Sequence, residues 1–341
     1  MTMFCMSLLL CLVAPPHRRV PPSVTFQTLG PATLGLAMSY DGSVVAGNHQ
    51  SPDGLSAFKW TADEGLVDLG FMVGGDYSKV HGISPDGSTV VGEGSSRQDV
   101  GSREAFRWTV DTGMVGLGDL ANGIKSSKAY DASWDGTTII GAAHSVLGQE
   151  AFYWTEEQGM VGIGELPGGV FNSAGVSCSY DGTMITGFSV NRGGIHAFSW
   201  TDKSGMIPLG DLFGGADYSK VWGMNSDGSE LVGQSTSDVA IEACRWVDGQ
   251  IVSLGIPNYS RALDVSEDGQ VIVGFVNGGA FLWTPEGMQY VQDVLVDDYG
   301  LDLTGWVLTS TQAVSADGTV LVGVATNPTG EQEAWICEFN Q

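Results

Sequence analysis

The chain has 341 residues, which is enough for two average domains or for one large β-barrel or β-propeller. Its 14 Lys and Arg residues against 39 Asp and Glu residues leave a formal net charge of −25. Binding to a phosphate backbone needs clustered cations, so this charge excludes nucleic acid as a partner. The 50 Gly residues disfavour a mostly helical chain, and a hydrophobic content of 43% argues against disorder. We therefore expect an acidic, turn-rich, all-β protein.

A twelve-residue apolar run, 3–14, opens the chain and is followed by Pro15 and Pro16. It is shorter than the about 20 residues that a transmembrane helix needs, but it fits the apolar segment of a secretory signal. No Lys or Arg precedes the run, so a start assigned too far downstream, or a leader that is not cleaved, is the alternative. We expect residues 1–22 to be a leader or signal-like segment. The protein is then exported, to the periplasm, cell surface or medium, without a transmembrane anchor.

An Asp-Gly dipeptide recurs through the rest of the chain at intervals of 41 to 49 residues. Its Asp residues are Asp41, Asp86, Asp135, Asp181, Asp227, Asp268 and Asp317. A further Gly follows each Asp after six residues, and then comes a cluster of the form Ala-aromatic-x-Trp, such as 105–108. Most copies end with Gly-Met-x-x-Leu-Gly, as in 113–118. An internal period of this length indicates a repeat architecture.

Each repeat predicts four short strands, which we name A to D in chain order. Strand A precedes the Asp, as in 78–83. Ser-x-Asp-Gly predicts a tight turn in which Asp accepts local backbone N–H groups and Gly adopts a positive φ. Strand B is β-branched, as in 138–140, strand C carries the Ala-aromatic-x-Trp cluster, and strand D carries Met-x-x-Leu-Gly. Four strands per repeat with a period in the forties are typical of a β-propeller.

The two ends of the chain complement each other. The seventh repeat ends after 334–339 without a strand D, whereas 24–30, before the first repeat, resembles an isolated strand D. Joining them removes two open sheet edges. We therefore predict a seven-bladed β-propeller of four-stranded antiparallel blades, with the last blade closed by the N-terminal strand. An eight-bladed ring or an open arc would leave both termini unpaired.

Residues 23–341 are thus expected to form a single propeller domain. It carries a short insertion at about 289–306, in which Val291, Val294 and Leu295 have helical spacing.

The set of Ser-x-Asp-Gly-x-x-x-x-Gly, Ala-Phe-x-Trp-Thr and Gly-Met-x-x-Leu-Gly resembles the HAF-type repeat of bacterial extracellular proteins. The resemblance covers about residues 24–341, and 302–335 is similar to the last repeat of such proteins. The chain departs from the pattern at Cys244, Trp335 and Cys337. The resemblance implies a secreted or surface β-propeller, and it carries over no active-site residues.

Few residues carry a signal for chemistry. A Trp recurs at one position of strand C, a regularity typical of packing between blades rather than of sugar binding. These residues are Trp60, Trp108, Trp154, Trp200, Trp246 and Trp283. Trp134 and Trp222 lie outside this column and are better candidates for ligand contact. Cys178, Cys244 and Cys337 replace apolar residues of sister repeats, so we expect buried free thiols. Each turn offers one carboxylate, and HExxH, GxSxG and phosphate-loop motifs are missing, so we predict no metal site, cofactor or catalytic residue.

One position at the start of strand A holds a basic residue in four repeats. These residues are Lys79, Lys128, Lys220 and Arg261. Because strand A is the innermost strand of a propeller blade, we expect a partial basic ring at one channel mouth, on the face with the D–A and B–C loops. A focused field there favours small anionic molecules or acidic glycans. Alternatively, these side chains extend into solvent and offset the acidic surface.

We therefore expect a monomeric, non-enzymatic, secreted or cell-surface binding module with its ligand at this mouth. Its partner is an anionic small molecule, a glycan or a surface protein. His81, Tyr130 and Trp222, also in strand A, complete the candidate ligand-binding residues. The alternative is an extracellular polysaccharide-active enzyme, a lyase or hydrolase, with His81 and Tyr130 as the local acid–base candidates. That alternative rests on the use of propeller folds for such activities.

Overall fold

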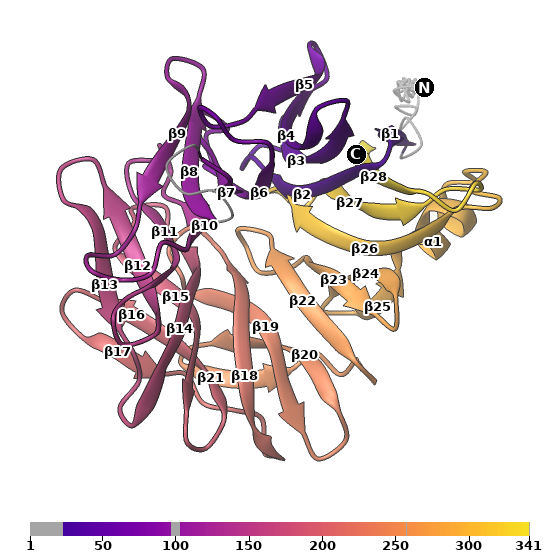
Figure 1. Cartoon of the computed structure of the whole chain (residues 1–341). Helices are drawn as coiled ribbons and strands as arrows, with labels where there is room; N and C mark the ends of the chain where they lie inside the picture. Colours follow the sequence, from indigo (N-terminus) through magenta and orange to yellow (C-terminus); the bar gives the residue numbers. More distant parts are fainter. Residues whose placement is uncertain (1–22, 97–102, 257, 341) are drawn as a thin grey trace, which may run out of the picture.

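The computed structural model describes residues 23–96, 103–256 and 258–340 (Figure 1). Strands make up 61% of the structure and helices 3%. The leader-like segment 1–22, with Cys5 and Cys11, lies outside the described residues. In the described ranges no helix is long and apolar enough to cross a membrane. The predicted all-β class is confirmed.

The strands follow the predicted A-to-D order through the repeats, which we number 1 to 7. The A strands are β2 (Thr33–Met38), β6 (Ser78–Ile83), β10 (Ser127–Ala132), β14 (Gly169–Cys178), β18 (Gly214–Met224), β22 (Ser260–Val265) and β26 (Val307–Val314). The B strands are β3 (Val44–Ser51), β7 (Val90–Gly94), β11 (Ile139–His144), β15 (Met184–Asn191), β19 (Glu230–Ser237), β23 (Ile272–Val276) and β27 (Val320–Thr326).

The outer strands complete the repeats. The C strands are β4 (Gly54–Thr61), β8 (Glu104–Thr109), β12 (Gln149–Thr155), β16 (Ile195–Thr201), β20 (Ile241–Val247), β24 (Gly279–Thr284) and β28 (Gln332–Asn340). The D strands are β5 (Gly65–Gly70), β9 (Gly113–Gly118), β13 (Gly159–Gly164), β17 (Gly205–Pro208), β21 (Gln250–Ser253) and β25 (Gly287–Tyr290), and β1 (Ser23–Pro31) occupies this place beside β28.

Within each repeat the strands pair antiparallel in chain order. Repeats 1, 2 and 6 form separate four-stranded sheets, whereas repeats 3, 4 and 5 share one twelve-stranded sheet. Single parallel pairs join those three repeats, Gln149 with Asn172 and Ile195 with Tyr218. The remaining sheet has the order β1-β28-β27-β26, so the first described strand pairs antiparallel with the last.

The Asp-Gly turns share one hydrogen-bond pattern, which explains why Ser-x-Asp-Gly recurs. In repeat 2, Ser84 Oγ donates to Asp86 Oδ1 at 2.6 Å, and the Ser88 N–H donates to the same oxygen at 2.9 Å. The Thr89 N–H in turn donates to Ser84 Oγ at 2.9 Å. Gly87 has φ of 73°, in the left-handed region that favours glycine. The predicted turn is confirmed.

The second recurring Gly lies in strand B, opposite a β-bulge in strand A. In repeat 2 the register shifts between Val80 and Gly82, which leaves His81 unpaired. A Cβ on Gly92 would lie 2.0 Å from the Lys79 carbonyl oxygen, and the equivalent Gly of every repeat has the same approach, at 1.9 to 2.1 Å. Only glycine fits beneath this carbonyl, so the Gly column and the bulge require each other.

In six of the seven repeats, a Ser or Thr of strand A joins the repeat to the one before it. Ser78 Oγ accepts the N–H of Ala57, in strand C of repeat 1, at 2.9 Å. The same contact joins repeats 2 to 3, 3 to 4, 4 to 5 and 5 to 6. Thr33 Oγ1 accepts the Ala334 N–H at 2.9 Å, which links the last repeat to the first.

The Trp column of strand C packs between repeats, as predicted. Arg107 of repeat 2 lies over the Trp154 ring of repeat 3, with its guanidinium carbon 5.0 Å from the ring centroid. Arg245 of repeat 5 lies over Trp283 of repeat 6 in the same way, at 5.1 Å. Trp246 is only 2% exposed. Trp60, Trp154 and Trp246 are buried, and Trp108, Trp200 and Trp283 are half-buried against hydrophobic clusters of the core, so the column serves packing between neighbouring sheets.

The three Cys residues of the described ranges, Cys178, Cys244 and Cys337, are buried and free, as expected from their apolar columns. Each packs in a separate hydrophobic cluster, so they act as small apolar side chains.

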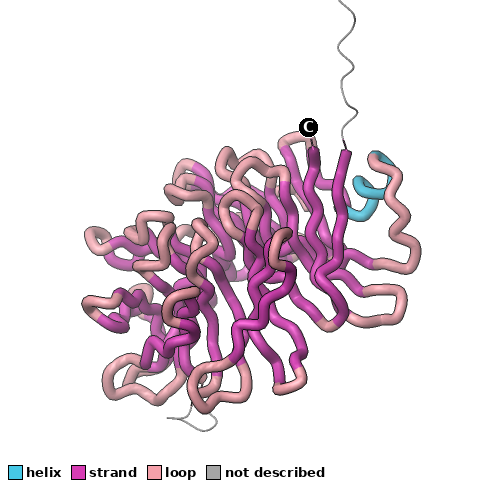
Figure 2. The backbone as a smooth tube through the Cα atoms, turned by 90° about the horizontal axis from the view of Figure 1, so that it is seen from above, coloured by secondary structure: helices cyan, strands magenta, loops and turns pink. Residues whose placement is uncertain are grey.

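The segment between β25 and β26 contains α1 (Val291–Asp293), which continues into the π-helical turn η1 (Val294–Asp298). Val291 and Leu295 are fully buried. Gln292 Oε1 accepts the Leu308 N–H at 3.0 Å and so fixes this helical segment to β26. Figure 2 shows the helix beside the sheet that holds both chain ends. The helical spacing in the sequence thus corresponds to a helix.

Candidate functional site

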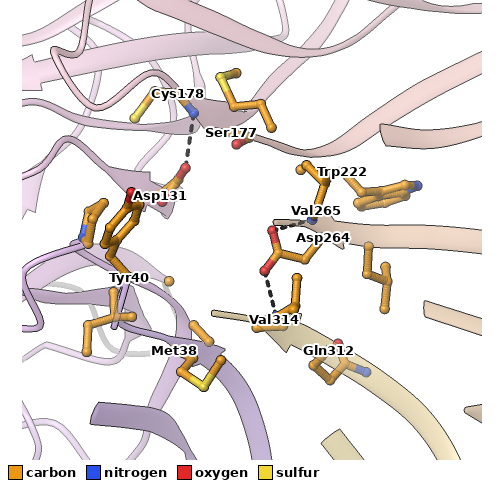
Figure 3. Close-up of a pocket in the computed structure, with 18 of the residues that line it drawn as sticks. Met38, Tyr40, Asp131, Ser177, Cys178, Trp222, Asp264, Val265, Gln312 and Val314 are labelled. Carbon is orange, nitrogen blue, oxygen red and sulfur yellow. Dashed lines mark hydrogen bonds between the residues drawn. The ribbon is translucent and has the colours of Figure 1, made fainter. Parts of the chain in front are cut away.

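A cavity of about 350 Å³ lies among the A strands of the seven repeats (Figure 3). Every A strand contributes lining residues, from its bulge to the Asp-Gly turn that follows. The cavity therefore lies toward the Asp-Gly turns. Its approach from the other side passes the starts of the A strands, where the basic residues are.

The strand geometry sorts the side chains into columns. The bulged residue of each A strand lines the cavity, and we call this set the bulge column. It consists of Leu36, His81, Tyr130, Val176, Trp222, Leu263 and Gln312. The residue two positions earlier lies on the same face of the strand, nearer the D–A connection. This basic column consists of Leu34, Lys79, Lys128, Ala174, Lys220, Arg261 and Ser310.

The predicted site residues thus occupy two adjacent levels. His81, Tyr130 and Trp222 line the cavity, whereas the four basic residues lie outside it, toward the D–A connections. The structure brings them together in two groups on different parts of the wall. One group surrounds Trp222 and the other surrounds Glu93.

In the first group, Lys220 and Arg261 both lie close to the Trp222 ring. The Lys220 Nζ is 5.7 Å from this ring's centroid, and the Arg261 guanidinium carbon is 4.4 Å from it. Lys220 also lies 4.0 Å from the centroid of Phe188, and Arg261 lies 5.3 Å from that of Phe275. Both cations are therefore held against aromatic faces, which attract positive charge.

Polar contacts fix Arg261 further. Its Nε donates to Gln234 Oε1 at 2.6 Å, and its Nη2 donates to the Tyr259 hydroxyl at 3.1 Å. Gln234 is fully buried and also donates to the Tyr218 hydroxyl. The guanidinium is thus preorganised by neutral partners.

No carboxylate forms an ion pair with Lys220 or Arg261 within the described ranges. Burial, and then the neighbouring charge of Arg261, lower the pKa of Lys220. Two cations that lack a counter-ion and sit side by side in a chain of net charge −25 form a site that favours an anion.

In the second group, a buried carboxylate stands at the centre. Glu93, in β7, has its Oε1 atom 3.6 Å from His81 Nε2. Its Oε2 atom is 3.4 Å from Lys128 Nζ. Arg103 Nε is 3.9 Å from the same Oε2. The Tyr130 ring packs on the His81 imidazole, with centroids 5.1 Å apart.

The electrostatics of this group favour a neutral imidazole beside an ionised carboxylate. Burial lowers the pKa of His81, and the charges of Lys79 and Lys128 lower it further, against an opposing effect of Glu93. His81, Lys128 and Arg103 together hold the pKa of Glu93 below its ordinary value despite its burial. Burial and the Glu93 charge raise the pKa of Tyr130.

Two carboxyl groups inside the cavity were not predicted from the sequence. Asp131 Oδ2 accepts the Cys178 N–H of the next repeat at 3.0 Å, and Asp264 Oδ2 accepts the Val314 N–H of its next repeat at 2.9 Å. Figure 3 shows both side chains in the wall of the cavity. Burial raises the pKa of Asp131 to about 6 and that of Asp264 to about 7.

Trp134, the other predicted candidate, lies at the Asp-Gly end. Its ring packs against Tyr40 and Tyr180, with centroids 5.4 to 5.5 Å apart in all three pairs. The Trp134 N–H donates to the Tyr180 carbonyl at 2.8 Å, and the Ala316 N–H donates to the Tyr40 carbonyl at 2.9 Å. Such backbone bonds between successive turns surround this end of the cavity, so Trp134 has a packing partner on each side.

The missed residues share a signal that the sequence does contain. Glu93, Phe188, Gln234 and Phe275 all follow the recurring Gly of strand B directly and pair across the ladder with the basic column. Each of Lys128, Lys220 and Arg261 contacts this residue in the preceding repeat. Aligning the position after the Gly would have found them.

In the part of the chain that the structure describes, no group of three or more His, Cys, Asp or Glu side chains could hold a metal ion. What the site presents instead is two cationic groups at the mouth and a His, Tyr and Trp level beneath them.

No protein-family model matches the chain, and no curated protein matches it. Among solved structures it is similar to the β-propeller domain of the Trilobed protease from Pyrococcus furiosus, with a TM-score of 0.59 and 11% identity over 92% of this chain and 96% of that one. It is also similar to oligogalacturonate lyase from Vibrio parahaemolyticus, with a TM-score of 0.58 and 11% identity over 93% and 97%. TolB from Acinetobacter baumannii gives a TM-score of 0.47 at 16% identity. The match covers 65% of this chain and 53% of the TolB chain, so this chain spans about half of TolB. The first two show that the fold is a β-propeller.

Proposed function

We propose that the seven repeats form a seven-bladed β-propeller whose last blade is completed by β1. The twelve-stranded sheet is then three blades that touch through one parallel pair at each junction. Three contacts between the ends of the described chain support this closure. They are the β1–β28 pairing, the Thr33–Ala334 hydrogen bond and the Ala316–Tyr40 hydrogen bond.

We further infer that the protein is a secreted or cell-surface binding module that holds an acidic ligand at the mouth with the D–A and B–C loops. The observation that carries this inference is the pair of Lys220 and Arg261 on Trp222, without a carboxylate partner in the described ranges. Export is supported by the apolar run 3–14 and by the resemblance to HAF-type repeats.

An anion at this pair gains from both charges. Burial, and then the repulsion between the two like charges, lower the pKa of Lys220, and a bound carboxylate or sulfate offsets that repulsion. Hydrogen bonds from Lys and Arg to an anion are about twice as strong as neutral ones. The ligand therefore supplies the negative charge that no carboxylate of the described residues brings to Lys220 and Arg261.

Acidic oligosaccharides fit the site better than a bare ion. Trp222, Tyr218 and Tyr259 place aromatic rings around the cations, and aromatic rings offer apolar faces to a sugar ring. One propeller of similar fold is named for its action on oligogalacturonate, which makes that uronic acid chain a suitable probe.

The test is calorimetric titration of oligogalacturonate and of a sulfated oligosaccharide into the wild type and into Lys220→Ala/Arg261→Ser. Repeats 4 and 7 carry Ala174 and Ser310 at these positions, so the fold accepts both replacements. We expect the double variant to bind at least about tenfold more weakly, since each charged hydrogen bond contributes about 1.5–3 kcal/mol. Raising the salt concentration should weaken binding to the wild type.

The matched control is Lys59→Ser/Lys203→Ala, which removes two positive charges away from the A strands, in β4 and in the β16–β17 turn. It should bind as the wild type does. Equal loss in both double variants would mean that net charge alone governs binding. An unchanged affinity in Lys220→Ala/Arg261→Ser would overturn the proposed site.

A further inference from the structure

The pair of His81 and Glu93 has no counterpart in the other repeats. Positions equivalent to His81 hold Leu, Tyr, Val, Trp or Gln, and positions equivalent to Glu93 hold Asn, Ala, Phe, Gln or Val. The repeat folds without either residue. Their contact at 3.6 Å, with Glu93 only 7% exposed at its side chain, therefore needs a reason beyond the architecture.

The surroundings of His81 are those of a proton acceptor for an anionic substrate. Its imidazole stands at the bulge of β6, in the wall of the cavity. Lys79 lies one level above it on the same face, and Lys128 and Arg103 lie around Glu93. The charged and titratable groups that face it are Lys79, Glu93, Arg103, Lys128 and Tyr130.

We propose that His81, positioned by Glu93, abstracts the proton at C5 of a bound 4-linked hexuronate, so that the sugar chain is cleaved by β-elimination. This inference rests on the proposed function, because it requires an acidic sugar at the same mouth. It adds to the lyase alternative the Glu93 carboxylate that positions the predicted base His81 beside the predicted cations.

The step balances without any co-reactant. The C5–H bond breaks, its proton moves to the free imidazole nitrogen, and its electron pair forms the C4=C5 double bond as the C4–O4 bond breaks. The leaving oxygen takes a proton from the Tyr130 hydroxyl or from water. The imidazolium then releases its proton to solvent, and the tyrosinate or hydroxide takes a proton back from solvent, so the enzyme returns to its starting state. Cations beside the substrate carboxylate make the C5 proton more acidic by stabilising the charge that develops there.

His81, Glu93 and Tyr130 have different roles in this elimination. His81 is kept neutral at the start by burial and by Lys79 and Lys128, so its imidazole is ready to accept a proton. Glu93 fixes the ring and stabilises the imidazolium that forms, which makes it a positioning residue. Tyr130 is protonated at neutral pH, and burial and the Glu93 charge raise its pKa further, so its hydroxyl carries a proton that the more basic leaving alkoxide can take.

The experiment follows the ultraviolet absorbance of the conjugated double bond in oligogalacturonate mixed with the wild type, His81→Leu and Glu93→Gln. Sister repeats carry Leu36, Leu263 and Gln234 at these positions, so both variants are expected to fold. We expect His81→Leu to lose at least about 100-fold in rate while its affinity stays within about threefold of the wild type. Glu93→Gln should be slower, and its acidic pH limb should move to lower pH, because the carboxylate raises the pKa of His81.

The outcomes separate the two proposals. If oligogalacturonate binds the wild type in a Lys220- and Arg261-dependent way but no double bond forms, the elimination is overturned and the binding function stands. If nothing binds, both fail. Cleavage to new reducing ends without the absorbance would show hydrolysis instead, and an unchanged rate in His81→Leu would remove His81 as the base.

Discussion

Asp131 and Asp264 place an acidic side chain where the other repeats have Gly, Ala or Ser at the same position after the bulge. Each carboxylate accepts one N–H from its own strand and one from the next repeat. These two hydrogen bonds do not offset the loss of hydration, because the pKa values still rise to about 6 and about 7. The ionised forms therefore cost stability in the folded state.

This cost predicts a pH dependence. A carboxyl whose folded pKa lies above its unfolded value binds more protons when folded, so stability is present at low pH and is lost as pH rises through the folded pKa. For Asp131 the loss falls between about pH 4 and about 6, and for Asp264 between about 4 and about 7.

Urea unfolding of the wild type and of Asp131→Asn/Asp264→Asn at pH 5 and pH 8 measures the effect. Between these two values the wild type should lose on the order of 3 kcal/mol relative to the variant. Parallel pH dependences in the two proteins would contradict the raised pKa values.

At this scale the sequence predicted some of the site and missed the rest for one reason. Lys220, Arg261 and Trp222 were predicted because all three lie in strand A. Aligning the repeats by their Asp-Gly turns places equivalent strand A positions in the same column. Glu93 and Gln234 lie in strand B, and they meet strand A of the following repeat only because adjacent sheets face each other. The packing between neighbouring sheets decides which side chains of two repeats meet. The residue spacing within one repeat carries no information about these contacts.

At the scale of the element, the bulge of strand A positions the site. It brings the carbonyl of each basic-column residue onto the Gly of strand B and turns the next side chain toward the cavity. The sequence predicted the Gly column but not the bulge, because a Gly within a strand is compatible with a tight turn, a bulge or a close approach.

Gly141→Ala tests the coupling, since its Cβ would lie 1.9 Å from the Lys128 carbonyl oxygen. We expect a loss of more than about 3 kcal/mol, or no folded protein, because backbone and not a flexible side chain must move. Gly118→Ala is the control, with φ of 78° but no atom within 4 Å, and should cost about 1 kcal/mol. Chemical denaturation measures both, and equal losses would mean that the close approach carries no special cost.

At the scale of the whole molecule, the architecture was readable because the same unit recurs seven times, so errors in one copy are corrected by the others. The shared sheet of repeats 3 to 5 was not predicted. It arises because β14 and β18, with 10 and 11 residues, are long enough to meet strand C of the preceding repeat. Strand length of this kind depends on loop conformation rather than on the repeat pattern.

The proposed closure makes β1 essential to the ring. Phe26 stacks on Trp335 with ring centroids 6.1 Å apart, and Val24 packs against the same cluster. A chain that begins at residue 32 should therefore unfold at a clearly lower temperature than one that begins at residue 23. Its exposed β28 edge should also promote self-association.

Thermal unfolding and size-exclusion chromatography of the two truncated chains test this. The chain that begins at residue 23 is the control, because it lacks only the leader-like segment. Identical unfolding temperatures and elution would show that β1 does not close the ring.

The side chains that face the cavity take no part in the contacts that repeat from unit to unit. Gly beneath the bulge, Ser at the start of strand A, Ala in strand C and Asp in the turn hold the backbone, while the bulge column varies from Leu36 to His81 to Trp222. Natural selection can therefore replace one wall residue at a time with little penalty to folding. A lineage of such proteins can diversify in what it recognises through point mutations alone, and a laboratory library restricted to these seven positions would explore the same variation.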